Sequence, residues 1–318
     1  MNTILEDAIG CHANDIYVLP HTDTHYVVKF HIDGRSSRYL TLTNAAAQQM
    51  ISAVKYRAKM NISERRRPQL GRFVHQDTWI RVSTVGDFLN RETLVLRLIY
   101  QASGDQNWLD PSQFDQLYHE MPSAGLFLMS GPTGSGKTTT LYQLLTQLAE
   151  HKLVLTIEDP VEIHQPQFVQ LQVNDEAGIH YDELIKVALR HRPEILLVGE
   201  IRDKLTAEAA IKAALSGHLV LSTIHAMSAR DVVLRLLDLG VDSAQLAVAL
   251  TGVAYQRLVM TTAATQAAIV DHLSADVIGR ILHGEQWPKF SQEWQEVLAH
   301  ALATKQIAND VYQTFTDL

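Results

Sequence analysis

Residues 131–138 read Gly-Pro-Thr-Gly-Ser-Gly-Lys-Thr and fit the phosphate-loop pattern G-x-x-x-x-G-K-[ST]. An apolar run at residues 126–129 precedes the loop, and a helical pattern over residues 138–150 follows it. The glycines let the backbone curl so that consecutive N–H groups point at phosphate oxygens, and the helix N-terminus adds partial positive charge. This order of strand, loop and helix predicts an α/β fold that binds a nucleotide.

Two side chains of the loop carry the predicted chemistry. Lys137 would reach the β and γ phosphates, and the Thr138 hydroxyl would bind Mg²⁺. The predicted nucleotide-binding residues are Gly131, Pro132, Thr133, Gly134, Ser135, Gly136, Lys137, Thr138 and Thr139. A loop alone predicts nucleotide binding and does not predict hydrolysis.

The rest of the second half supports a mostly parallel sheet. Uninterrupted apolar runs at residues 126–129, 153–157, 195–198 and 219–222 alternate with helical patterns. Such runs are typical of parallel strands that helices cover on both faces. Beyond about Gly240 we expect helices as far as the C-terminus.

The first hundred residues predict an α+β domain. Residues 26–32 alternate as a strand and end in the turn signal Asp33-Gly34, and a return strand begins at residues 40–42. The expected helix covers residues 45–60, and the expected further strands cover residues 78–82 and 93–99. A polar linker at residues 102–107 separates the halves. The expected domains are 1–104, 105–265 and a helical extension at 266–318.

Carboxylates follow two of the apolar runs. Glu200 comes after the run at 195–198, while Glu158 and Glu162 come at the end of the run at 153–157 and just beyond it. In open α/β sheets, ligands bind at the carboxyl ends of the strands. Glu200 could hold Mg²⁺ or polarise the attacking water, and the pattern does not decide which of the three carboxylates activates water. Each cluster taken alone could instead be a solvated turn or a helix cap.

Histidines flank the strand expected at residues 219–222. His225 could sense or orient the γ phosphate, and His218 stands before the strand. The two would lie roughly 20 Å apart, so one zinc ion cannot bridge them. The alternative for each is a packed or hydrogen-bonded histidine. Cys11 is the single cysteine, which excludes a disulfide framework and a four-cysteine zinc site, so we expect no zinc.

The charge balance limits the partners. The 318 residues include 27 basic and 35 acidic side chains, a formal net charge of −8. This balance argues against a general nucleic-acid coat or a binder of anionic lipid. The basic run at residues 65–67 reads better as a solvated or interface face than as a nucleic-acid site. No apolar stretch is long enough to span a membrane and the N-terminus has no basic signal region, so we expect a cytosolic protein.

Several ordered motifs together resemble the type II secretion and type IV pilus assembly ATPase superfamily. They are an N-terminal box at 13–17, the hairpin Asp33-Gly34, a Walker A motif at 131–140, an aspartate box at 156–162, a Walker B signature at 190–203, a histidine box at 216–225 and the element 256–258. Residues 61–73 and 81–84 resemble the assembly and secretion branch rather than the retraction motors. The short chain without a tetracysteine insertion is most similar to the competence-pilus assembly ATPases of Gram-positive bacteria.

The resemblance implies a PAS-like N-terminal α+β domain, a RecA-like P-loop NTPase domain and C-terminal helices. It implies that Arg81 and Arg97 reach the nucleotide, that His225 acts at the γ phosphate, and that ATP and Mg²⁺ are bound, the metal by Thr138 and Glu200. It also implies a homo-hexamer at the cytoplasmic face of the membrane. That hexamer would drive a polytopic inner-membrane platform protein to assemble a type IV competence pilus or pseudopilus for DNA uptake. Membrane association would come through partners only, with no direct nucleic-acid binding.

The chain departs from the family pattern at three places. Glu194 replaces an aspartate, Ala226-Met227 replace Thr-Asn after His225, and residues 261–268 replace a basic, cysteine-containing stretch. Without the resemblance, each arginine would read as a surface charge. Two rival functions stay open: a nucleic-acid translocase, which would show nucleic-acid-stimulated ATPase activity, and a nucleotide-gated scaffold that binds ATP but hardly hydrolyses it.

Overall fold

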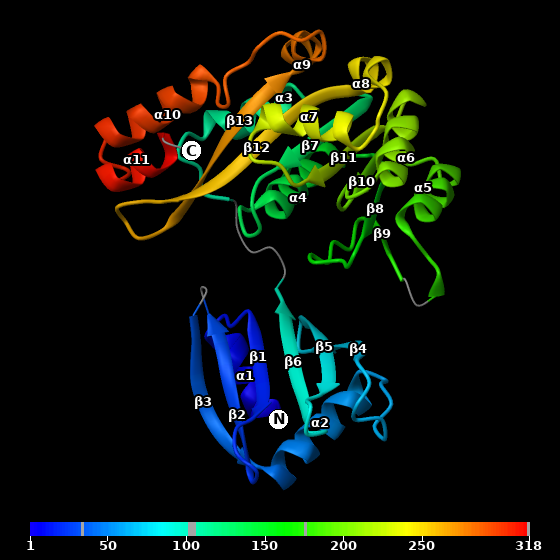
Figure 1. Cartoon of the computed structure of the whole chain (residues 1–318), viewed down its shortest axis with the longest axis vertical. Coiled ribbons are helices and arrows are strands. Elements are labelled where there is room, and N and C mark those ends of the chain that lie inside the picture. The colour runs from blue at the N-terminus through cyan, green and yellow to red at the C-terminus, as the bar shows by residue number, and fades with distance from the viewer. Residues whose placement is uncertain (33–34, 101–105, 175–176, 317–318) are drawn as a thin grey trace. The chain divides into compact units, whose positions relative to one another are not determined.

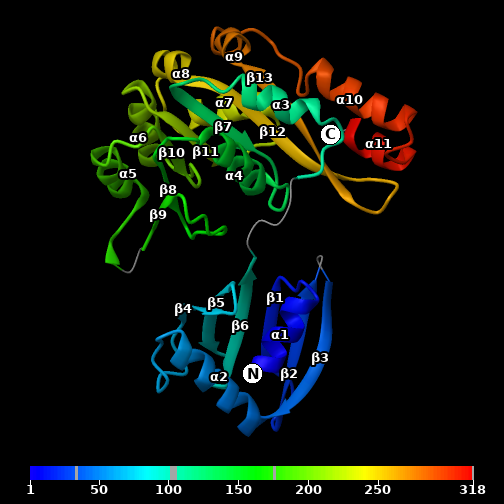
Figure 2. The ribbon, with the colours of Figure 1, turned by 180° about the vertical axis from the view of Figure 1, so that it is seen from behind.

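The structure is a computed structural model of the chain, and it describes residues 1–32, 35–100, 106–174 and 177–316. The chain divides into two units, Met1–Ser103 and Gly104–Leu318 (Figures 1 and 2). The expected boundary at residue 104 and most of the expected linker lie outside the described residues, as does the turn Asp33-Gly34.

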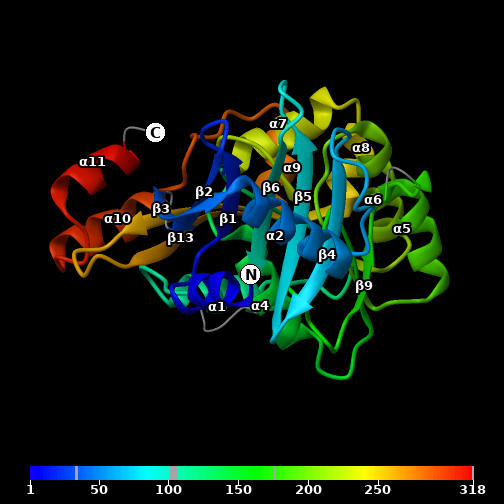
Figure 3. The ribbon, with the colours of Figure 1, turned by 90° about the horizontal axis from the view of Figure 1, so that it is seen from below.

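The first unit is an antiparallel sheet with two helices. Its elements are α1 (Asn2–Gly10), β1 (Asp15–Pro20), β2 (His25–Ile32), β3 (Arg35–Thr43), α2 (Asn44–Arg57), β4 (Gln69–His75), β5 (Thr78–Gly86) and β6 (Glu92–Ile99). Within the described residues the strand order is β3-β2-β1-β6-β5-β4. Strands β5 and β6 alternate in burial, as expected where one face of a sheet is covered. Both helices, which Figure 3 shows with the sheet, contribute to one core that includes Leu5, Ile16 and Ile51. The strands and the helix predicted for this half are therefore confirmed.

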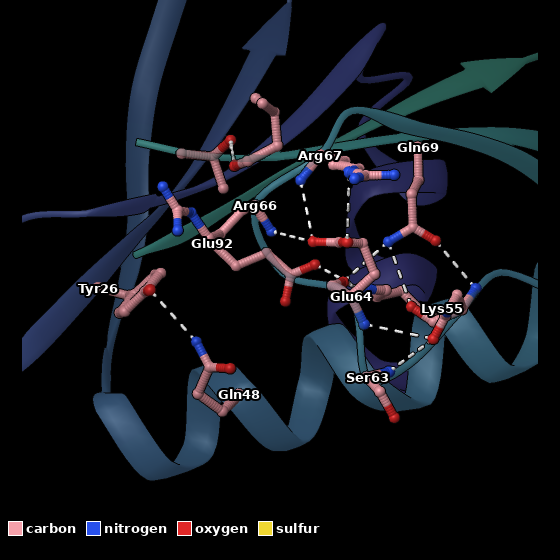
Figure 4. A network of polar contacts seen from close by, with 12 residues as sticks. Tyr26, Gln48, Lys55, Ser63, Glu64, Arg66, Arg67, Gln69 and Glu92 are labelled. Atoms are coloured by element: carbon pink, nitrogen blue, oxygen red, sulfur yellow. Dashed lines mark hydrogen bonds and ion pairs between the residues drawn. The ribbon is translucent and has the colours of Figure 1, made fainter. Parts of the chain in front are cut away.

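A buried ion pair anchors the segment at residues 61–73, the segment that resembles the assembly and secretion branch in sequence. Lys55 on α2 and Glu92 on β6 are almost fully buried, and Lys55 Nζ lies 2.6 Å from Glu92 Oε1 (Figure 4). Lys55 Nζ also donates to the main-chain oxygen of Glu64. The Glu64 carboxylate accepts the backbone N–H groups of Arg66 and Arg67 at 2.8 and 3.1 Å. Because a buried charge is costly without its partner, this pair ties the loop to α2 and β6.

The second unit is a mostly parallel sheet between two layers of helices. Its elements as far as β11 are α3 (Ser112–His119), β7 (Gly125–Ser130), α4 (Lys137–Leu148), β8 (Val154–Glu158), β9 (Val169–Gln172), α5 (Tyr181–Arg190), β10 (Ile195–Val198), α6 (Lys204–Leu215) and β11 (Leu219–Ile224). The chain continues with α7 (Ala229–Asp238), α8 (Ser243–Ala249), β12 (Leu250–Met260), β13 (Gln266–Ser274), α9 (Ala275–Leu282), α10 (Gln292–Ala303) and α11 (Asn309–Thr316). The strand order is β13-β12-β7-β11-β10-β8-β9, and among the described strands of this sheet only the pair β12–β13 is antiparallel.

Strand β7 shows why both faces of this sheet are covered. Leu126 and Leu128 belong to one buried core, whereas Phe127 and Met129 belong to another. Since successive side chains of a strand point to opposite faces, these are the cores on the two sides of the sheet. The predicted α/β fold with a parallel sheet is confirmed.

The expectation of helix from about Gly240 onward is wrong for β12 and β13. These strands pair along nine residue positions, and β12 also pairs in parallel with β7. Residues 266–274, assigned to a helical extension, therefore form an edge strand of the main sheet. A buried apolar run gives no period-2 signal, so it resembles a buried helix in sequence. Helices α9 to α11 follow, as expected.

Within the described residues, none of the helices has the length and apolar character needed to cross a bilayer.

One buried carboxyl joins β13 to the helix that follows it. Asp271 is 1% exposed, and its Oδ1 accepts the backbone N–H of Ser291, the N-cap of α10, at 3.0 Å. Burial raises the pKa of Asp271 to about 6 against the lowering effect of the Ser291 hydrogen bonds, and the nearby charge of Glu293 raises it further. The junction between β13 and α10 therefore includes a carboxyl group with a pKa of about 6, which changes its charge within the pH range of ordinary stability measurements.

Asp271 predicts a specific pH dependence of stability. Its pKa in the folded chain is higher than the value of about 3.9 expected in the unfolded chain, so between these values the folded state holds the extra proton. The free energy of unfolding should thus fall as pH rises from about 4 to about 6, by at most about 3 kcal/mol from this group. Urea denaturation at several pH values should show that Asp271→Asn removes this component. Parallel stability curves for the two proteins would contradict the assignment.

Candidate nucleotide-binding site

The phosphate loop connects the end of β7 to the start of α4. Gly131, Gly134 and Gly136 have φ values of 140°, 77° and 83°, a backbone region that side chains other than glycine rarely adopt. A Cβ on Gly131 would also lie 2.3 Å from the main-chain oxygen of Gln256. Gly131 and Gly136 are therefore required by both conformation and space, and Gly134 is required by conformation alone.

The start of α4 offers donors to an anion. Gly136 stands at the N-cap position and brings no side chain, so the first N–H groups of the helix receive no cap from it. Pro132, Thr133 and Gly134 are exposed, while Thr138 and Thr139 on the first turn are partly exposed. The helix end can thus bind a phosphate through its N–H groups and its positive dipole end.

Lys137 folds back over the loop. Its Nζ donates to the main-chain oxygens of Gly131 and Pro132 at 2.8 and 2.9 Å. Burial lowers the pKa of Lys137, and the charges of Glu200 and Glu162 counteract this effect. The amine thus lies at the loop, where it can exchange its carbonyl partners for phosphate oxygens.

Glu200 lies just beyond β10 in a charged cluster. Arg202 Nε donates to Glu200 Oε2 at 2.8 Å, and His225 Nε2 lies 3.4 Å from Oε1. Arg202 also lies 3.9 Å from Asp159 Oδ2. The parallel register of β10 and β11 puts the ends of both strands at one sheet edge, which explains why Glu200 meets His225.

Glu158 is a buried carboxyl at the end of β8. Its Oε1 accepts the Tyr142 and Thr156 hydroxyls, each at 2.6 Å, and Gln170 Nε2 donates to the Tyr142 hydroxyl at 2.8 Å. Burial raises the pKa of Glu158, although the two hydroxyl hydrogen bonds lower it. A carboxyl whose pKa is raised is a better proton acceptor than an ordinary carboxylate.

Glu162 and His218 have different surroundings. Glu162 is exposed and acts on Lys137 through its charge. His218 precedes β11, at the opposite end of the strand from His225, and its Nδ1 lies 3.1 Å from the main-chain oxygen of Ala213. The loop, Glu162, Glu200 and His225 thus belong to the same sheet edge, and His218 does not.

The departure at Ala226 has a backbone partner. Ala226 N donates to Ser130 Oγ at 3.1 Å, and Ser130 is the last residue of β7 before the loop. The chain after His225 is therefore tied to the base of the loop through the main chain, whatever side chain stands at position 226. Glu194, the other departure, accepts the Leu153 N–H at 2.7 Å at the far end of β10.

Arg81 and Arg97 belong to the first unit. They lie directly opposite each other on β5 and β6, and Arg97 Nε donates to Asp15 Oδ1 at 2.8 Å. Like charges in opposite positions of a sheet repel each other, and the carboxylate of Asp15 offsets this repulsion between Arg81 and Arg97. Because the loop lies in the second unit, the action of these arginines at the nucleotide is a proposal.

The donor set fits Mg²⁺. The ion usually takes one or two protein oxygens together with waters and substrate phosphates, and the hydroxyl of Thr138 and the carboxylate of Glu200 are of that type. In the described part of the chain, no three His, Cys, Asp or Glu side chains are grouped to hold a metal ion.

Sequence reasoning missed three residues that shape this site. Arg202 lay inside the quoted Walker B segment, and Gln256 lay inside the element 256–258, but neither received a role. Tyr142 carries no sequence signal, because its contact with Glu158 depends on how α4 packs against β8.

The parallel sheet and the phosphate loop between β7 and α4 define a P-loop ATPase with a RecA-like core. A family model described as "Type II/IV secretion system protein" matches residues 1–312. The chain therefore belongs to the type II/IV secretion system protein family, and it is an ATP hydrolase of that family.

Two relatives and one solved structure are similar to most of the chain. The chain is 42% identical to the competence protein ComGA of Streptococcus pneumoniae over 77% of this chain and 79% of the relative. It is 39% identical to the type II secretion system protein E of Pseudomonas aeruginosa over 81% of this chain and 53% of the relative, so it spans about half of that protein. The pilus retraction motor PilT with bound ADP superposes with a TM-score of 0.80 at 22% identity, covering 99% of this chain and 96% of PilT. The resemblance inferred from the motifs is confirmed, and PilT shows the fold alone.

Proposed function

We propose that this chain is a homo-hexameric motor that hydrolyses ATP to assemble a type IV competence pilus or pseudopilus for DNA uptake. The observation that carries the proposal is the phosphate loop with Lys137 and Glu200 at one sheet edge, in a chain 42% identical to a competence protein. The motor would work at the cytoplasmic face of the membrane on a polytopic platform protein, and it would reach the membrane only through such partners.

The residues divide the proposed reaction between them. The loop N–H groups and Lys137 hold the phosphates of ATP, and Thr138 and Glu200 would hold Mg²⁺. When bound, the ion offsets charge on the β and γ phosphates. Glu200 polarises the attacking water, and His225 orients the γ phosphate beside it. Since phosphoryl transfer requires little covalent chemistry from the protein, positioning and charge supply the catalysis.

Arg81 and Arg97 couple hydrolysis to movement in this proposal. A guanidinium stays charged and pairs with two phosphate oxygens at once. If both arginines engage the nucleotide only when the two units close on it, binding and release drive that closure and its reversal.

A turnover assay with and without DNA tests the proposal against other functions. The proposed motor hydrolyses ATP at a rate that single- or double-stranded DNA leaves unchanged. Strong stimulation by DNA would instead identify a nucleic-acid translocase. Tight ATP binding with almost no turnover would identify a nucleotide-gated scaffold.

The proposal also predicts an oligomer. Native mass measurement with a non-hydrolysable ATP analogue should give six copies of the 35.6 kDa chain. The sample needs only this chain, because the proposed ring consists of six identical subunits. A monomer that persists at high protein concentration, with and without the analogue, would contradict the ring.

A further inference from the structure

Gln256 stands beside the phosphate loop because of the sheet register. Strand β12 runs parallel to β7, and their last paired residues are Tyr255 and Ser130. The next residues along the two strands are Gln256 and Gly131, the first residue of the loop. Gln256 is completely buried, so it reaches the loop from the interior of the unit.

Gln256 contacts both ends of the loop. Its Nε2 donates to the main-chain oxygen of Ser135 at 2.7 Å. A Cβ placed on Gly136 would lie 2.8 Å from that same nitrogen, and a Cβ on Gly131 would lie 2.3 Å from the Gln256 main-chain oxygen. The side chain thus packs against the end of the loop, and its main chain packs against the start.

The hydrogen bond to Ser135 also sets the direction of a phosphate donor. In a trans peptide the C=O and the next N–H point in opposite directions. Holding the Ser135 oxygen toward buried Gln256 therefore turns the Gly136 N–H away from the interior. That N–H belongs to the group at the start of α4 that can bind an anion.

We propose that Gln256 is a positioning residue for the nucleotide: its amide fixes the Ser135–Gly136 peptide and holds the loop ready for phosphate. The inference rests on nucleotide binding at this loop, as the proposed function requires. Strand β12 would thus contribute a residue to the nucleotide site, although it lies outside the phosphate-loop motif.

The test is Gln256→Met in the full-length chain. Methionine has a similar length and no donor, so it fills the space and leaves the buried Ser135 oxygen without this partner. The Kd for ADP, measured by titration of a fluorescent ADP analogue and by competition with ADP, should rise about tenfold, which corresponds to about 1.4 kcal/mol. The kcat for ATP should fall as well, because a displaced loop also misplaces the phosphates.

Gln113 provides a matched control. It is a buried glutamine on α3, and its Nε2 donates to the main-chain oxygen of Val270 at 2.8 Å while its Oε1 accepts the Val270 N–H at 3.2 Å. Gln113→Met should lower the thermal midpoint but leave the Kd for ADP unchanged. The comparison separates lost stability from lost positioning.

A second variant keeps the test informative if Gln256→Met fails to fold. Gln256→Glu preserves the shape but presents a carboxylate oxygen to the Ser135 oxygen, and it should weaken ADP binding at least as much. If the wild-type chain binds ADP and a folded Gln256 variant binds it within twofold as tightly, this inference is overturned and the proposed function stands. If the wild-type chain binds no nucleotide, the proposed function fails and this inference fails with it.

Discussion

Replacing Lys137 with alanine should reduce ATP turnover by about 10³-fold, to the background of the assay. The side chain is the loop's own cation, and it donates to Gly131 and Pro132 at the place where phosphate oxygens would compete for it. Alanine removes the charge that would stabilise the transferred phosphoryl group, and no other lysine belongs to the loop. A coupled-enzyme assay for released phosphate measures the loss directly.

Lys152→Ala is the control for this prediction. Lys152 is an exposed lysine just beyond the other end of α4, so the variant removes a charge of the same kind at a place away from the loop. It should retain wild-type turnover. Unchanged hydrolysis in a folded Lys137→Ala protein would mean that the phosphate loop is not the catalytic site.

The fold was predictable where side-chain patterns report burial directly. Residues 28–31 of strand β2 alternate between buried and partly exposed, and the runs that form β7, β10 and β11 are short, apolar and followed by helical patterns. The same logic failed at β12, where Val253, Ala254 and Tyr255 are all buried. A strand covered on both faces has no polar side to mark its period. In addition, no helix separates β12 from its antiparallel partner β13, so the alternation of strand and helix that marked the earlier strands is missing there.

The site was predictable where chemistry depends on neighbours in sequence. The glycines and Lys137 act within one loop, and Glu200 follows a strand whose end must lie at the ligand edge. The supporting contacts could not be predicted, because they join distant segments: Tyr142 to Glu158, Arg202 to Asp159, and Gln256 to Ser135. Each depends on the register or packing of the strand or helix that bears it.

The three carboxylates differ in ways that rank them for the role of activating water. Glu158 already receives two hydroxyl hydrogen bonds on one oxygen and is buried, and Glu162 is exposed. Glu200 is partly buried, carries a charge that acts on Lys137, and lies beside His225. We therefore expect Glu200 to contribute most to turnover.

Glu200→Gln should lower kcat for ATP by about 10²- to 10⁴-fold while nucleotide binding is retained. Glutamine keeps the shape of the side chain but cannot accept a proton from water, and it removes the anion that Arg202 and His225 face. Single-turnover kinetics together with ADP titration separate the chemical step from binding. Glu158→Gln and Glu162→Gln, measured in the same way, should show smaller losses of kcat.

Glu194→Gln is the matched control, because Glu194 and Glu200 flank the same strand at opposite ends. Glu194 accepts the Leu153 N–H at 2.7 Å, away from the edge that carries the loop, and glutamine can still accept that hydrogen bond. The variant should keep wild-type kcat. A larger loss in Glu158→Gln than in Glu200→Gln would transfer the water-activating role to the buried carboxyl of β8, whose raised pKa then becomes the property that matters for catalysis.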